Sequence, residues 1–151
     1  MVDKLGLNLL KFCSKKSILI KVKTIKQTYI IKATLEDVWK AIVDPKFIEA
    51  WGGGPAKMDD KPGNKFSLWG GSIWGRNIEV VPNKKLVQDW YSDEENKWEQ
   101  PSKVTFTLQA EKDGVKLELV HENIPDENAN DIDKGWKDYY LGPLKNYLES
   151  N

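Results

Sequence analysis

The chain has 151 residues, enough for one domain with a single hydrophobic core. Its 23 basic and 23 acidic side chains cancel, so no net charge would draw the protein to nucleic acid or to an anionic membrane. One cysteine, Cys13, and one histidine, His121, exclude an internal disulfide, a cysteine metal cluster and a paired-histidine metal site.

Residues 1–21 are expected to form an N-terminal extension, and residues 22–151 the domain itself. The apolar stretch near the start is broken by Gly6 and Asn8, which makes it a poor secretory signal. The apolar run at 18–20 is far shorter than the ~20 residues that a membrane-spanning helix requires. We therefore expect a cytoplasmic protein with no membrane partner.

The domain is expected to open with one strand and two short helices. Apolar and polar residues alternate within 22–31, which is the pattern of a half-buried strand. Thr34 precedes Asp37 by three residues in a weak capping-box pattern, and apolar residues then follow at helical spacing. A second helix begins at Pro45, and the glycines after Trp51 end it.

Turn-forming residues then separate five further strands, so an antiparallel sheet is expected. These strands cover 65–68, 73–81, 86–91, about 104–110 and 115–121. The last two are joined by Asp113 and Gly114, and apolar residues alternate along both, as in a β-hairpin.

A final helix from about Asp131 presents an apolar stripe. The members of the stripe lie four residues apart and are Ile132, Trp136, Tyr140, Leu144 and Leu148. Pro143 lies inside this helix, so we expect a bend near Gly142. An antiparallel sheet with one apolar face needs a cover, and this helix is long enough to provide it. The predicted fold is α+β, a curved antiparallel sheet of about six strands around a long C-terminal helix.

Residues 51–55, Trp-Gly-Gly-Gly-Pro, raise the question of a phosphate-binding loop, because the N–H groups of a glycine run can converge on an anion. A P-loop requires a lysine and a hydroxyl residue at the start of a helix, whereas Pro55, Ala56 and Lys57 follow the glycines here. We expect a connection between a helix and a strand rather than a phosphate site.

Several motifs recur in the order and spacing of a known family. They are ATLEDVWKA at 33–41, DP at 44–45, Trp51, PGNKF at 62–66, GGSIWG at 70–75, VPNKKLV at 81–87, Trp90, GWKDYY at 135–140 and Leu144. Over about residues 23–150 the chain resembles the START-like, helix-grip domains related to the activator of heat-shock-protein-90 ATPase.

The resemblance implies a cavity between the sheet and the C-terminal helix, with residues 51–55 near its mouth. Eukaryotic co-chaperones of this family have two domains, and this sequence is similar to the C-terminal one. Their N-terminal domain bears much of the contact that stimulates the ATPase. Some wider relatives bind lipids, hormones or polyketide-like molecules in the cavity.

Aromatic side chains supply most of the candidate ligand-binding residues, because small-molecule cavities are mostly apolar with a few polar groups. The candidates are Trp51, Phe66, Trp69, Trp74, Arg76, Trp90, His121, Trp136 and Tyr140. Core packing is the alternative for Trp90 and Trp136, which have apolar neighbours on their elements. Trp69 and Trp74 lie beside glycines and fit either a pocket rim or a partner surface. Arg76 fits either a ligand carboxylate or an exposed strand position.

His121 is the candidate for acid–base chemistry, since the charge of histidine changes near neutral pH. Catalysis would require a nucleophile, a metal or an orienting carboxylate beside it, and only Asp89, Glu118 and Glu122 are scattered candidates. We therefore expect no catalytic residues, no metal and no cofactor.

The leading hypothesis is a non-enzymatic, co-chaperone-type regulator that acts through a heat-shock-protein-90-type chaperone. The alternative is a carrier or sensor of a small hydrophobic ligand held between the sheet and the C-terminal helix. A third hypothesis is a cyclase- or hydratase-like enzyme that uses His121. Neither nucleic acid nor a membrane is an expected partner.

Overall fold

The structure is a computed structural model that describes residues 21–92 and 100–150. The expected N-terminal extension, apart from Lys21, and Cys13 lie outside the described residues. Six strands form one antiparallel sheet in the order β1-β6-β5-β4-β3-β2. Their bounds are β1 Val22–Ile31, β2 Lys65–Leu68, β3 Ile73–Val81, β4 Lys85–Ser92, β5 Ser102–Glu111 and β6 Gly114–Pro125.

Two short helices follow β1, as the sequence predicts. They are α2, Leu35–Val43, and α3, Pro45–Trp51. The hydroxyl oxygen of Thr34 accepts a hydrogen bond from the Asp37 N–H at 3.1 Å, so the predicted N-cap of α2 is confirmed. The 3₁₀ turn η1, Trp69–Gly71, connects β2 to β3.

The C-terminal helix is continuous along the chain but changes its winding. It comprises the 3₁₀ turn η2 (Asp126–Asn128), α4 (Ala129–Gly135), the π-helical turn η3 (Trp136–Leu141) and α5 (Gly142–Glu149). In η3 the Gly142 N–H bonds the Lys137 carbonyl, five residues back. A proline inside a helix cannot donate to the carbonyl four residues before it, and the wider turn before Pro143 accommodates this loss.

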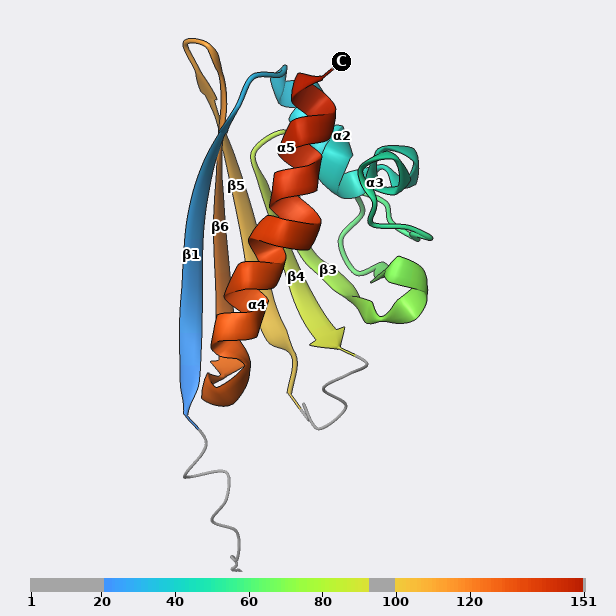
Figure 1. The fold of residues 1–151 in the computed structure, drawn as a ribbon. Helices are drawn as coiled ribbons and strands as arrows, with labels where there is room; N and C mark the ends of the chain where they lie inside the picture. The colour runs from blue at the N-terminus through green and yellow to red at the C-terminus, as the bar shows by residue number, and fades with distance from the viewer. Residues whose placement is uncertain (1–20, 93–99, 151) are drawn as a thin grey trace, which may run out of the picture.

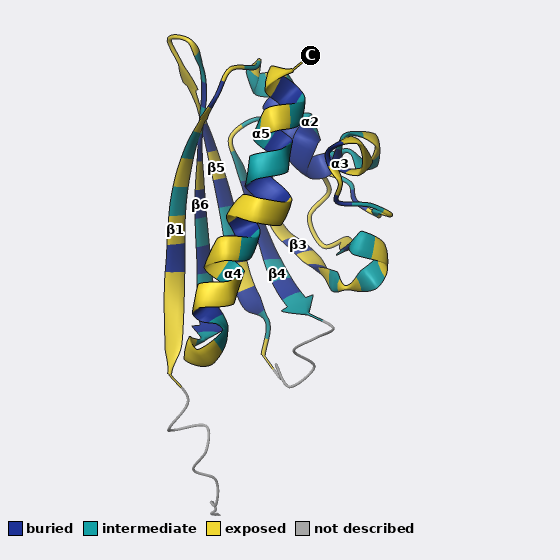
Figure 2. Cartoon of the chain, in the orientation of Figure 1, coloured by how far each residue is buried: buried dark blue, intermediate teal, exposed yellow. Residues whose placement is uncertain are grey.

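The helix lies across one face of the sheet, and α2 and α3 pack beside its C-terminal half (Figure 1). The strands alternate between buried and exposed positions, and the buried face of the helix points to the sheet (Figure 2). In β6 the inward positions are Val115, Leu117, Leu119 and His121. The predicted architecture of a curved antiparallel sheet around a C-terminal helix is confirmed.

The apolar stripe of the helix lies in this core as predicted. Trp136, Tyr140, Leu144 and Leu148 are buried, and Ile132 is partly buried against the same cluster. The stripe therefore covers the inner face of the sheet.

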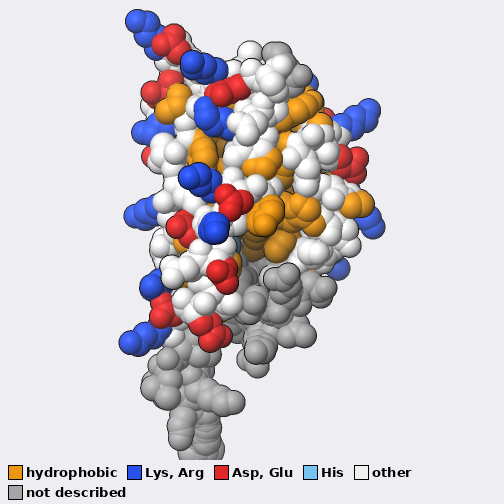
Figure 3. Space-filling view, in the orientation of Figure 1, with side chains coloured by type: hydrophobic (Ala, Val, Ile, Leu, Met, Phe, Trp, Pro, Cys, Tyr) orange, Lys and Arg blue, Asp and Glu red, His pale blue; other side chains and the backbone are white. Residues whose placement is uncertain are grey.

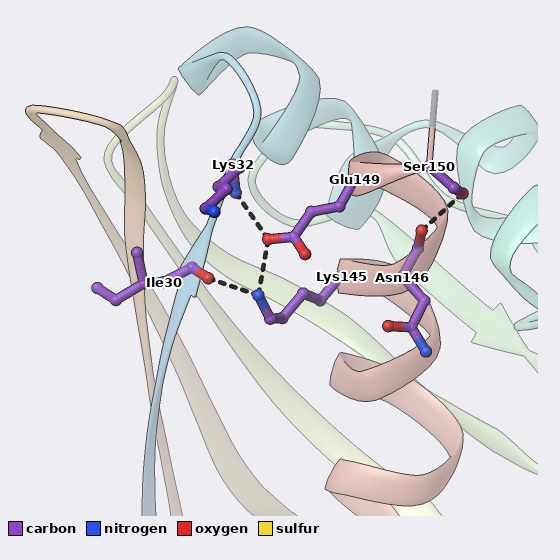
Figure 4. Close-up of polar contacts among 6 residues, drawn as sticks. All are labelled: Ile30, Lys32, Lys145, Asn146, Glu149 and Ser150. Atoms are coloured by element: carbon purple, nitrogen blue, oxygen red, sulfur yellow. Dashed lines mark hydrogen bonds and ion pairs between the residues drawn. The ribbon is translucent and has the colours of Figure 1, made fainter.

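Polar contacts hold the end of α5 against the edge strand β1 (Figure 4). The Lys145 ammonium donates to the Ile30 carbonyl at 2.9 Å and pairs with the Glu149 carboxylate at 2.6 Å. The same carboxylate accepts from the Lys32 N–H at 2.9 Å. The hydrogen bond from Lys145 lowers the pKa of Glu149. Through these contacts, side chains of the helix satisfy one backbone carbonyl and one backbone N–H at the edge of the sheet.

The glycine run after α3 is a helix end tied to η1. Gly52 has a φ of 110°, a left-handed conformation that favours glycine, and the Gly53 N–H donates to the Ile48 carbonyl at 2.8 Å. The Trp69 N–H donates to the Gly53 carbonyl at 2.8 Å, and its indole N–H donates to the Gly52 carbonyl at 2.9 Å. These hydrogen bonds show that the glycine run serves as a structural connection after α3, as the order of residues 51–57 predicts.

Candidate functional site

A pocket of about 450 Å³ lies between the C-terminal helix and the sheet. Among the described residues it is lined by Trp69, Ser72, Ile73, Trp90, Ser92, His121, Asn128, Asp131, Ile132, Gly135, Trp136, Tyr139 and Tyr140. On the same side of the molecule, hydrophobic side chains gather between the helix and the segment around η1 (Figure 3). The volume falls within the range of pockets that hold small organic ligands.

Aromatic rings form a continuous wall on the inner side of this pocket. The rings of Trp90 and Trp136 are stacked, with centroids 4.8 Å apart and an interplanar angle of 28°. The Tyr140 ring lies 4.7 Å from that of Trp136 and 6.1 Å from that of Trp69. Offset and edge-on contacts of this kind stabilise aromatic clusters beyond simple burial. The wall is therefore closely packed and mainly apolar.

His121 is bonded through both ring nitrogens. The Trp136 indole N–H donates to Nδ1 at 2.9 Å, so the ring proton resides on Nε2, which donates to the Ser102 hydroxyl at 2.8 Å. The Ser102 hydroxyl in turn donates to the Trp90 carbonyl at 3.4 Å. Burial lowers the pKa of His121 to about 3, so the imidazole is neutral at physiological pH.

A second buried network starts from the other stacked indole. The Trp90 N–H donates to the Gln88 side-chain carbonyl at 2.9 Å, and the Gln88 amide donates to the Asn77 side-chain carbonyl at 2.9 Å. Asn77 then donates to the Asp59 backbone carbonyl at 2.9 Å. Both indole N–H groups are thus paired inside the protein, so Trp90 and Trp136 contribute apolar surface to the pocket.

Two polar atoms of the lining residues have no partner among the described residues. They are the Tyr140 hydroxyl and the Asn128 side-chain oxygen, and both are buried. Burial raises the pKa of the Tyr140 hydroxyl, which therefore stays protonated and able to donate. An unpaired buried polar group costs about 1–3 kcal/mol, so these two atoms are unsatisfied polar groups inside the protein beside the pocket.

The structure brings five of the nine predicted site residues together. The five that line the pocket are Trp69, Trp90, His121, Trp136 and Tyr140. Trp51 and Phe66 are buried behind the wall: the Trp51 ring lies 4.6 Å from that of Tyr140, and the Phe66 ring lies 6.3 Å from that of Trp90.

Trp74 and Arg76 lie on the opposite, outer face of the sheet, away from the pocket. On β3 the inward positions are Gly75 and Asn77, which are buried, so their neighbours point outward. The Trp74 ring stacks on that of Tyr91, with centroids 5.8 Å apart. Arg76 donates to the Gly63 carbonyl at 2.7 Å. Neither residue belongs with the others in one site.

Sequence reasoning missed part of the pocket lining, above all the residues on the C-terminal helix beside the apolar stripe. Asn128, Asp131, Gly135 and Tyr139 line it, and the last three each precede a member of the apolar stripe by one residue, on the neighbouring face of the helix. That spacing, read together with the stripe, was the signal that could have found them. The 51–55 loop, which the resemblance placed near the cavity mouth, contributes no residue to the described lining.

The geometry offers no obvious catalytic arrangement in the part of the chain that is described. The nitrogens of His121 bond Trp136 and Ser102, and the candidate Glu118 is paired with Lys116 at 3.6 Å. The described residues contain no group of three side chains suited to hold a metal ion. In the same residues, no helix has the length and apolar character needed to cross a membrane.

The sequence of the chain matches a family of known proteins. The sequence profile described as activator of Hsp90 ATPase homolog 1-like protein matches residues 32–149. The activator of 90 kDa heat shock protein ATPase homolog of Dictyostelium discoideum is 31% identical over 124 residues, which cover 82% of this chain and 32% of that protein. The chain thus spans about a third of the length of the curated relatives it matches.

Solved structures show the same fold. An HSP90 activator from Plasmodium falciparum gives a TM-score of 0.74 at 27% identity, with 83% of this chain and 96% of that chain covered. A protein from Mesorhizobium loti gives a TM-score of 0.72 at 24% identity, with 85% and 98% covered. The helix-grip architecture is common to all of them.

Proposed function

The chain belongs to the family of activator of Hsp90 ATPase homolog 1-like proteins, and we propose that it is a non-enzymatic regulator that binds an Hsp90-type chaperone. The observation that carries the proposal is the match over residues 32–149, together with relatives named as activators of this ATPase. A regulator of this kind acts by binding one conformation of its partner more tightly than another.

The site geometry supports a binding role over a catalytic one. General acid–base catalysis requires a side chain that can exchange a proton near the working pH. His121 is neutral and bonded on both nitrogens, and its low pKa makes it a poor base. Its bonds instead fix the Trp136 ring in the core.

We assign the chaperone contact to the outer face of β3 and β4. Trp74 is 38% exposed there and stacks on Tyr91, and the cationic Arg76 lies two residues along the same strand. Aromatic residues and arginine are enriched in the energetic centres of protein interfaces. Two rings that already stack on each other lose less conformational entropy on binding than separate side chains would, which favours the pair as an anchor.

Replacing Trp74 with alanine is expected to weaken binding to the Hsp90-type chaperone of the same organism at least tenfold. Loss of a central interface tryptophan costs about 2 kcal/mol or more, and 1.4 kcal/mol corresponds to a factor of ten. Calorimetric titration of the chaperone with each variant gives the dissociation constants. Ile30→Ala is the matched control, because Ile30 is 48% exposed on β1 at the far edge of the sheet.

If both substitutions weaken chaperone binding equally, the contact does not lie on the outer face of β3 and β4. The proposal that the chain binds the chaperone would then still stand. If the unchanged protein does not bind the chaperone, the proposed partnership itself is refuted. Denaturant unfolding of each variant verifies that the fold is retained.

A second candidate function is the carriage of a small hydrophobic ligand, and the pocket is the observation that favours it. Its volume of about 450 Å³ and its aromatic wall are suited to an apolar molecule. The pocket and the outer-face pair lie on opposite sides of the sheet, so the two functions are compatible in one domain.

A further inference from the structure

We propose that residues 1–20 of the chain dock on the domain and cover the mouth of the pocket between the C-terminal helix and the sheet. The occupant of this surface is thus a segment of the chain itself. Four observations support the docking: the apolar surface left open at the pocket, the point where the segment joins the domain, its sequence pattern and its charge. Such docking adds a property that neither candidate function includes, and it does not depend on the chaperone contact.

The described residues leave apolar surface open at the mouth of the pocket. Tyr139 is 69% exposed, and Trp69, Ile73 and Ile132, which line the same pocket, are partly exposed. Hydrophobic side chains gather on this side of the molecule, between the helix and the segment around η1 (Figure 3). Clustered apolar side chains beside a groove are typical of a binding surface.

The segment joins the domain beside this pocket. The Asp126 N–H donates to the Lys21 carbonyl at 2.8 Å. Asp126 begins the C-terminal helix, and Asn128, two residues later, lines the pocket. An extended chain spans about 3.3 Å per residue, so residues 14–20 alone can reach about 23 Å from Lys21. The pocket is therefore within reach of the residues that precede them.

The sequence of the segment has the pattern of an amphipathic helix. Its apolar residues at spacings of three and four are Val2, Leu5, Leu9 and Phe12, which would share one face of such a helix. Leu7 would lie on the opposite face. Apolar anchors at this spacing are how a helix binds a hydrophobic groove. The open mouth of the pocket is a surface of matching character.

Charge matches the segment to the pocket side of the domain. Residues 1–20 contain four lysines and one aspartate, a net charge of +3, and the neutrality of the whole chain leaves −3 on the remainder. Asp131 is the charged side chain among the described lining residues, and it is exposed. Lys134 and Lys137 of the same helix line a different groove, beside β1. Complementary charge of this kind attracts the segment to the pocket side.

The exposed aromatic pair on the outer face of the sheet is a poorer match. Trp74 and Tyr91 stack there, and the Arg76 guanidinium lies two residues along the same strand. This cation repels a segment of positive charge, whereas Asp131 at the pocket attracts it. The pocket is therefore the favoured site.

Weak contacts suffice to hold the segment, because it belongs to the same chain. A short tether gives an effective concentration on the order of 1 mM. With an intrinsic dissociation constant of about 0.1 mM, the segment would be docked about nine-tenths of the time. A small ligand then has to displace the segment, so the chain controls access to its own pocket.

The test uses Cys13, which is the only cysteine of the chain and belongs to this segment. A nitroxide spin label on its thiol broadens the NMR signals of nearby protons. In the labelled full chain, the Tyr139 amide and Trp69 indole signals are expected to lose about half of their intensity or more. The Ile30 amide, near the far end of β1, should lose less than about a tenth. Tenfold dilution should leave these losses unchanged, because the docking is within one chain.

Leu9→Asp and Leu7→Asp are the matched variants. Both add the same charge to the segment, but only Leu9 belongs to the predicted apolar face. Leu9→Asp should reduce the broadening at Trp69 and Tyr139 by about threefold or more, and Leu7→Asp should leave it nearly unchanged. In protein without the label, Leu9→Asp should shift these two signals and Leu7→Asp should not. This second readout remains valid if the label itself disturbs the docking.

Three results would overturn the inference. The first is no broadening at Tyr139 and Trp69, together with no shift on Leu9→Asp. In that case, binding of the full chain to phosphatidylserine vesicles that Leu9→Asp abolishes would assign the apolar face to a membrane surface. The second is stronger broadening at Trp74 than at Trp69, which would place the segment on the outer face. The third is equal broadening of isotope-labelled protein by a separate spin-labelled copy, which would show docking between two molecules. None of these results bears on whether the chain binds a chaperone.

Discussion

Replacing Trp136 with alanine is expected to lower the free energy of unfolding by about 3–5 kcal/mol, the cost typical of deleting a large buried aromatic side chain. The residue is 3% exposed, and its ring contacts Trp90, Phe106 and Tyr140 with centroids no more than 5.8 Å away. Its loss also leaves His121 Nδ1 buried without a donor. Urea unfolding followed by circular dichroism gives the change in stability.

Trp136→Phe is the matched control for this prediction. Phenylalanine keeps a ring in the stack and removes the N–H that bonds His121, so the expected cost is about 1–3 kcal/mol. A loss of less than 1 kcal/mol for the alanine variant would contradict the central position assigned to this ring. Equal losses in both variants would assign the whole effect to the hydrogen bond and none to packing.

Acidification should destabilise the fold through His121. The pKa of His121 is about 3 in the folded protein and near its usual 6.5 in the unfolded chain. Below pH 6.5 the unfolded chain therefore binds a proton at this residue that the folded protein does not bind. The stability that the neutral imidazole contributes is complete above pH 6.5 and is lost progressively as the pH falls from 6.5 towards 3. At pH 5 the expected loss from this group is about 2 kcal/mol.

His121→Gln isolates this titration, because an amide can accept from Trp136 and donate to Ser102 but has no proton to gain in this range. Urea unfolding at pH 7.5 and pH 5 should show a loss about 2 kcal/mol larger for the unchanged protein than for the variant. An identical loss in both would show that His121 is accessible to protons when folded, which would reopen a catalytic role for it.

The sequence predicted the architecture closely where side-chain pattern and turn chemistry agree. The Asp113-Gly114 turn and the alternation on both sides of it predicted the hairpin of β5 and β6, although β6 continues to Pro125, past the expected end at 121. The position of Pro143 predicted a bend near Gly142, and the structure has a π-helical turn, Trp136–Leu141, directly before that residue. Pattern alone could not specify that a π-helical turn would accommodate it.

The outward direction of Trp74 was harder to predict, because apolar content does not distinguish the two faces of β3. The inner position beside it belongs to Gly75, where an added Cβ would collide with the Asp89 carbonyl oxygen. Asn77 faces inward because Gln88 and the Asp59 carbonyl satisfy its amide. These reasons are long-range contacts, which become visible only when the strands are paired.

The sequence could have predicted that Ser102 lies beside His121. The turn at 113–114 sets a register in which Val104 pairs with His121, and Ser102 lies two residues further along on the same face. The sequence could not have predicted that the Tyr140 hydroxyl is unpaired, because this depends on whether any neighbouring element places a hydrogen-bonding group beside it.

The most direct test of the proposed chaperone regulation is the ATP turnover of the Hsp90-type chaperone from the same organism, measured with increasing amounts of the purified full chain. A saturable change in turnover is expected, reduced by Trp74→Ala and unaffected by Ile30→Ala. Turnover that stays constant at saturating concentration, with no complex detected by calorimetry, would contradict the proposal that this chain regulates such a chaperone.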